Sequence, residues 1–234
     1  MKNHTLLSIL GFVLISYSVL AQSSSDLLKH YKSYYIQMQK TADAQGIINA
    51  LNHLVILEPN VQRQDTLAAY YMNEGQYVQA LSIIGVQKNE ADTDLAVEVK
   101  AVCLKSLNES ERALEQYELL FLRRPSASLA YELADLKIQT NDIMGANLNI
   151  TYGMANSPDD MMKPFYETQT PYQVPLKIAF TYLKAIAKFR ENPESNHDSA
   201  IAILDEALVV SPQFNLASIA KTAIENQKNI NSEE

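Results

Sequence analysis

ALEQYELLFLRRPSASLAYELADLKIQTNDIMGANLNITYGMANSP (residues 113–158) contains the same spacing pattern twice. The interval from Ala113 to Ala146 equals the interval from Pro125 to Pro158. A small residue lets two helices approach closely, whereas a proline ends a helix because it cannot donate a backbone hydrogen bond. The stretch therefore predicts two copies of a helix that packs closely on a neighbour and then stops.

The same interval, which is the period of the pattern, extends toward the N-terminus. Alanines recur at this spacing in two series: Ala80, Ala113 and Ala146, and Ala68, Ala101 and Ala134. A large residue follows the first series by four positions, as one helical turn requires, at Ile84, Tyr117 and Ile150. One helix pair cannot bury its own apolar face, so neighbouring pairs must stack. The sequence therefore predicts an all-α fold, an α-solenoid of antiparallel helix pairs.

The pattern resembles that of the tetratricopeptide-repeat (TPR) family over residues 26–158, as about four repeats. The residues that carry the resemblance are Leu67-Ala68 with Tyr71, Gly75-Gln76-Tyr77 in a turn, Ala80-Leu81, Ala113-Leu114 with Tyr117 and Pro125, and Leu133-Ala134 with Ala146, Ile150 and Pro158. Family repeats usually have about 34 residues, and the period here is one residue shorter. The resemblance implies a TPR superhelix.

The period fails after Pro158. Residues 159–173 predict a Pro-containing insertion loop, residues 174–212 a further TPR-like helix pair, residues 214–229 a C-terminal capping helix, and residues 230–234 a disordered tail. The insertion carries Phe165, Tyr166 and Tyr172. These aromatic side chains either pack onto the array or form a possible contact with a partner, because unusually long loops are often functional.

Residues 1–21 predict a secretory signal peptide, with Lys2 before an apolar run and cleavage after Ala21. The apolar run of about 15 residues is shorter than the roughly 20 that span a bilayer, so we expect no stable membrane span after cleavage. The expected location is the periplasm or the outside of the cell. Cys103 is the only cysteine and is expected to be a buried apolar residue.

The formal net charge of −8 argues against nucleic acid as a partner, because a phosphate backbone would be repelled. We find no catalytic signature, no Gly-rich phosphate loop and no His or Cys cluster at metal-ligand spacing. His30, His53 and His197 lie in separate predicted elements. The sequence therefore favours a protein that is not an enzyme and needs no cofactor and no metal.

The resemblance implies an inner groove lined by the first helix of each repeat. Its partner-binding positions correspond to Lys32, Asp65, Met72, Asn73, Glu98, Lys105, Tyr131, Asp135 and Gln139. Family members that bind acidic tails carry several Lys and Asn at such positions, whereas three of these positions are acidic: Asp65, Glu98 and Asp135. A neutral, basic or extended polar segment of a protein is therefore the expected partner. The leading hypothesis is an exported scaffold that binds a protein or peptide in this groove. The alternative is a structural subunit of a cell-envelope assembly that uses its convex face or the 159–173 loop.

Overall fold

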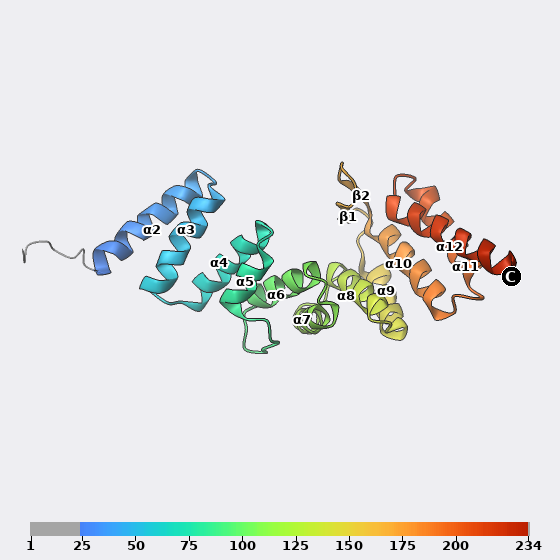
Figure 1. Cartoon of the computed structure of the whole chain (residues 1–234), viewed down its shortest axis with the longest axis horizontal. Helices are drawn as coiled ribbons and strands as arrows, with labels where there is room; N and C mark the ends of the chain where they lie inside the picture. The colour runs from blue at the N-terminus through green and yellow to red at the C-terminus, as the bar shows by residue number, and fades with distance from the viewer. Residues whose placement is uncertain (1–23, 234) are drawn as a thin grey trace, which may run out of the picture. The chain divides into compact units, whose positions relative to one another are not determined.

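The computed structural model describes residues 24–233, so the predicted signal peptide lies outside the described residues. Helices make up most of this part of the chain, and they follow one another in pairs joined by short turns (Figure 1). The all-α prediction is therefore confirmed. The chain divides into two compact units, Met1–Ile84 and Gly85–Glu234, called below the N-terminal and the C-terminal unit.

The described part of the N-terminal unit contains two helix pairs. Its helices are α2 (Ser24–Lys40), α3 (Ala44–Leu57), α4 (Val61–Asn73) and α5 (Tyr77–Ile84). Ile48, Leu51 and Leu67 form the centre of its core. The helix α5 is short because Gly85 follows it with a φ of +78°, a backbone conformation that a helix cannot contain.

The C-terminal unit contains three helix pairs, a hairpin and a last helix. Its elements are α6 (Asp94–Ser106), α7 (Ser110–Arg123), α8 (Ala127–Gln139), α9 (Ile143–Asn156), β1 (Met162–Phe165), β2 (Tyr172–Pro175), α10 (Leu176–Glu191), α11 (His197–Val210) and α12 (Asn215–Glu233). Each helix packs against the next along the chain from α6 to α9, and α10 packs against α8, α9 and α11. The first helices α8 and α10 are thus also in contact with the pair that precedes each of them in this unit.

The repeated alanines lie where helices meet. Six of them have a relative exposure of 0%: Ala68, Ala80, Ala101, Ala113, Ala134 and Ala146. Inserting a larger side chain at such a fully buried position generally overpacks the core. The prediction that small residues set the packing of the helix pairs is therefore confirmed.

The turns within the first four helix pairs show the same period. The residues with positive φ in these turns are Ala42, Gly75, Asn108 and Asn141, and they recur at the interval that separates the alanines of each series. In each turn the next backbone N–H donates back to the last turn of the first helix, as Asp142 N does to Lys137 O at 2.8 Å. A residue in this left-handed conformation is the usual way to end a helix and begin its partner.

Two segments differ from the sequence-based prediction. Residues 159–173 were expected to form a loop, but they contain an antiparallel hairpin in which Phe165 pairs with Tyr172 and Met162 with Pro175. The alternation of side chains in these four-residue strands is too short to be recognised in the sequence. The helix α12 continues to Glu233, into the tail that was expected to be disordered, because no Pro or Gly interrupts it.

Candidate partner-binding groove

A hollow of about 670 Å³ lies among α6, α7 and α8 of the C-terminal unit. Val102, Leu120 and Leu129 contribute apolar surface to its lining. Charged side chains also line it: Glu98, Lys105, Arg124 and Glu132. An apolar hollow of this size with a few charged groups is typical of a binding site.

Lys105 of α6 lies between two carboxylates of α8. Its Nζ donates to Glu132 Oε2 and to Asp135 Oδ2, both at 2.6 Å. Burial alone would lower the pKa of Lys105, but the two carboxylates outweigh burial and raise this pKa above its ordinary value. The first helices of two successive pairs are thus joined by a partly buried ionic contact.

Glu132 also binds a second lysine, which comes from the hairpin. Lys163 Nζ of β1 donates to Glu132 Oε1 at 2.6 Å, and it lies 4.7 Å from the centroid of the Tyr131 ring. Burial would raise the pKa of Glu132, but Lys105 and Lys163 outweigh burial and hold this pKa below its ordinary value. Glu132 therefore stays ionised and connects α6, α8 and the hairpin.

The ring of Tyr131 lies between the Lys163 ammonium and the core residue Phe180. Tyr131 is only 5% exposed. Its ring packs edge to face against the ring of Phe180 in α10, with 5.5 Å between the two ring centroids. Burial raises the pKa of its hydroxyl well above the ordinary value. One side of the Tyr131 ring is therefore part of the core, and the Lys163 ammonium lies over the ring.

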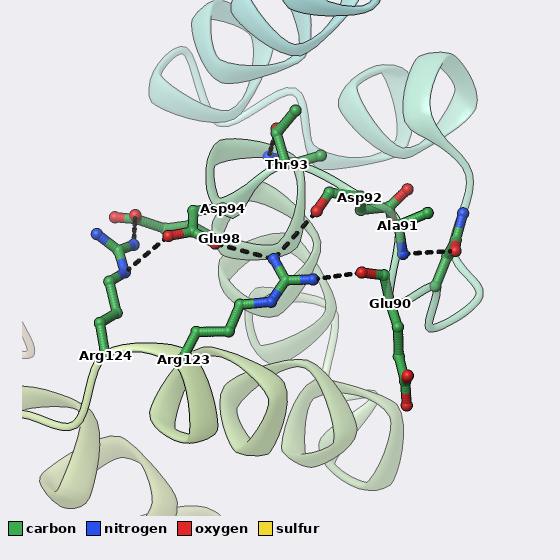
Figure 2. A network of polar contacts seen from close by, with 10 residues as sticks. Glu90, Ala91, Asp92, Thr93, Asp94, Glu98, Arg123 and Arg124 are labelled. Carbon is green, nitrogen blue, oxygen red and sulfur yellow. Dashed lines mark hydrogen bonds and ion pairs between the residues drawn. The ribbon is translucent and has the colours of Figure 1, made fainter.

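A second polar network fixes the segment that precedes α6 (Figure 2). Arg123, at the end of α7, donates to the backbone carbonyls of Glu90 and Asp92 at 2.8 and 3.0 Å, and to the Asp94 carboxylate at 2.8 Å. Arg124 donates to Glu98 Oε2 at 2.6 Å. These contacts hold the N-terminal end of α6, and with it Glu98, beside the hollow.

The structure brings together four of the predicted groove residues. Glu98 and Lys105 line the hollow, while Tyr131 and Asp135 lie in the contacts around Glu132 just described. Gln139 lies farther along α8, where its amide oxygen accepts a hydrogen bond from Ser110 Oγ at 3.1 Å. That these residues bind a partner stays a prediction.

The other predicted groove residues lie in the N-terminal unit. Lys32 helps to line a hollow of about 480 Å³ together with Tyr35 and Arg63, and its Nζ is 2.9 Å from Glu58 Oε2. Asp65 is buried, whereas Met72 is half-buried and Asn73 exposed at the end of α4. Of these four residues, only Lys32 lines the hollow.

The aromatic residues of the insertion have different surroundings. Phe165 is buried, and its ring stacks on Tyr172 at 5.5 Å and lies 5.0 Å from Phe214. Tyr166 is 73% exposed. Phe165 and Tyr172 thus pack onto the array in this structure, and Tyr166 presents its ring to solvent.

Glu132 and Lys163 are central to the site, and neither was among the residues predicted from the sequence. Glu132 could have been noticed as an acidic residue in the otherwise apolar run Ala130 to Ala134. Lys163 gives no such signal, because it lies 31 residues from Glu132 and outside the repeats.

Within residues 24–233, no three His, Cys, Asp or Glu side chains are placed so that they could hold a metal ion. No helix of this described part is both long and apolar enough to cross a membrane.

Comparison with solved structures supports the interpretation of the repeats. One similar structure is that of a tetratricopeptide repeat protein from Parabacteroides merdae, with a TM-score of 0.63 and 15% sequence identity. The match covers 88% of this chain and 76% of the Parabacteroides chain. The chain has a TPR-like fold. The structure of the MamA protein is also similar, with a TM-score of 0.58 and 14% sequence identity. That match covers 81% of this chain and 94% of the MamA chain. No protein-family model and no curated protein matches the sequence. At these identities the likeness concerns the repeat fold alone.

Proposed function

We propose that this chain is an exported scaffold that binds a segment of another protein in the groove between α6 and α8. The observation that carries the proposal is the hollow of about 670 Å³, which lies on the first helices of two successive pairs. Its apolar lining can hold a partner's side chain away from water, and its charged groups can fix the orientation of the segment. The side chains that would make contact come from a rigid helical scaffold.

The charge of the C-terminal unit favours a neutral or basic segment. Of the 27 acidic residues of the chain, 22 lie in Gly85–Glu234, together with 14 of the 19 basic residues. The net charge of −8 is therefore carried by this unit. A field of this sign attracts cationic segments and repels acidic ones, more strongly at low salt.

Blocking the hollow tests the proposal. Val102 is half-buried in the lining, so Val102→Lys places a long charged side chain in the hollow without removing an ion pair. Leu122→Lys is the matched control, because Leu122 is 80% exposed on α7 and does not line the hollow. Chemical crosslinking in the cell of origin, followed by mass spectrometry, identifies the proteins that each variant contacts.

We expect one crosslinked protein to be lost with Val102→Lys and retained with Leu122→Lys. Circular dichroism checks that both variants keep their helices. If both variants crosslink the same proteins as the parent chain, the groove proposal is wrong. If only acidic proteins are captured, the charge argument fails.

A structural subunit of a cell-envelope assembly is the second candidate. Exposed apolar side chains outside the groove favour it: Tyr166 at the hairpin is 73% exposed, and Met144 of α9 is 80% exposed. Tyr166→Ser and Met144→Ser would then abolish assembly, measured by native gel migration of envelope extracts, while Val102→Lys would leave it intact.

Export is part of both proposals. It is supported by the apolar N-terminal stretch that ends at Ala21. N-terminal sequencing of the protein recovered from the periplasm or the medium would begin at Gln22 if cleavage follows Ala21.

A further inference from the structure

The contact between Lys163, Glu132 and Tyr131 has the form of a small binding site with an occupant. The ammonium of Lys163 meets a carboxylate oxygen at 2.6 Å and an aromatic ring at 4.7 Å. A carboxylate binds an ammonium ion by charge-assisted hydrogen bonds, and an aromatic ring attracts it through the electrons of its face. The chain thus places an ammonium of its own on the first helix of a repeat, where the groove is expected.

Several contacts that do not involve Lys163 also hold the hairpin on the array. Phe165 is buried against Tyr172 and Phe214, and Leu176 N donates to Met161 O at 2.8 Å at the base of the hairpin. These contacts involve other side chains and the backbone. The Lys163 side chain can therefore leave Glu132 by rotating its own bonds while the hairpin stays in place.

The site is also within reach of a bound segment. Glu132 lines the hollow of about 670 Å³, and the Lys163 side chain is 26% exposed. Lys100 provides a contrast, because its side chain is 3% exposed and bound to Asp92 and to the Gln87 carbonyl. Of these two lysines, only Lys163 has a side chain exposed enough for water or a ligand to take over its contact with a carboxylate.

We propose that Tyr131 and Glu132 form a subsite for a primary ammonium group, which Lys163 occupies within the chain and which a lysine of the partner replaces on binding. The inference rests on the proposed function, because it names the residue type that the partner presents. A buried carboxylate without a cationic partner would be costly. The exchange of one ammonium for another avoids this cost, because Glu132 keeps an ammonium partner throughout. The hairpin thereby competes with the partner and sets a threshold for binding.

A small lysine analogue tests the subsite without a natural partner. The probe is Nα-acetyl-lysine methylamide, and the uncharged norleucine analogue is its matched control ligand. Binding is followed by NMR of the mature chain labelled at tyrosine, through the Tyr131 signal. The variants are Lys163→Gln, the double variant Lys163→Gln/Glu132→Gln, and Lys177→Gln as matched control. Lys177 of α10 pairs with the exposed Asp159, so this control removes the same charge elsewhere.

A tethered competitor acts like a free ligand at about millimolar concentration, so its removal changes affinity by a modest factor. We expect the Kd of the lysine probe to fall about fivefold or more in Lys163→Gln and to be unchanged in Lys177→Gln. The second substitution at Glu132 should abolish this gain, and the norleucine probe should cause no shift in any variant. If Lys163→Gln loses its helical signal, Lys163→Met keeps the apolar stem and is titrated in its place.

Three results would overturn the inference: an equal Kd in the parent and in Lys163→Gln, an equal gain in Lys177→Gln, or a gain that persists without Glu132. These outcomes are separate from the test of the groove. The proposed function is wrong if Val102→Lys leaves the set of crosslinked proteins unchanged. The titration with the lysine probe measures the affinity of the subsite for an ammonium group and does not depend on that result.

Discussion

Gly153 of α9 determines how closely α9 and α10 approach each other. A Cβ atom at this position would lie 1.9 Å from Phe180 Cζ and 2.4 Å from Phe180 Cε1 and Cε2. Phe180 has 0% exposure, and its ring packs edge to face against the ring of Tyr131. The substitution Gly153→Ala must therefore displace a fully buried ring.

The expected loss of stability follows from two opposing effects. Overpacking of a core costs about 1–3 kcal/mol, and the severe overlap here places the cost in the upper part of this range. Replacing glycine by alanine inside a helix stabilises it by about 1 kcal/mol. The net loss is about 1–2 kcal/mol, which lowers the Tm of a unit of this size by about 2–8 °C.

Thermal unfolding of the mature chain, followed by circular dichroism at 222 nm, measures this effect. Gly145→Ala is the matched control in the same helix. The Cβ at Gly145 would meet the carboxylate of Asp142, which is exposed and can rotate away. Loss of that helix cap costs about 1 kcal/mol, and the gain in helix propensity offsets it, so the Tm should hardly change.

A double substitution tests the mechanism itself. The substitution Phe180→Leu replaces the ring with a smaller side chain. It should cost less stability in the Gly153→Ala background than in the parent, because there it also removes the overlap with the new Cβ atom at position 153. A Gly153→Ala chain as stable as the parent would refute the reasoning, and so would strictly additive effects of the two substitutions.

Two further predictions concern single titrating groups. Burial raises the pKa of Cys103 to about 11, so the thiol should react with Ellman's reagent at pH 8 only when urea unfolds the chain; rapid reaction of the folded chain would show that the site opens. The folded-state pKa of Glu132 lies below its unfolded value of about 4.3, so its contribution to stability is complete above that pH and is lost as the pH falls through the folded pKa. The difference in Tm between the parent and Glu132→Gln should therefore shrink below about pH 4.3, while the half-exposed Glu118→Gln control should show little difference at any pH.

Much of the fold could be predicted because the repeat is a local feature. The recurring alanines mark the close contacts between helices, and the structure buries all six of them completely. The turns between paired helices were harder to find. Their left-handed residues are Gly75, Asn108 and Asn141 in three cases, but Ala42 in the fourth, where the sequence contains no residue that favours this conformation.

The candidate site could be predicted only in part. Family resemblance placed Glu98, Lys105, Tyr131 and Asp135 on the inner side of the repeats, and the structure brings them together in one unit. It did not indicate Glu132, because the resemblance supplies a set of positions and not the partners of a side chain.

The sequence by itself determined which residues recur, and that the chain forms helices arranged in pairs. These properties depend on neighbours within one or two helical turns. Only the tertiary structure decided that Lys105 and Lys163 meet at Glu132, across 27 and 31 residues of sequence, and that the insertion folds as a hairpin over Tyr131. Such contacts depend on the distance between elements that pack side by side, and a pattern along one chain does not contain that distance.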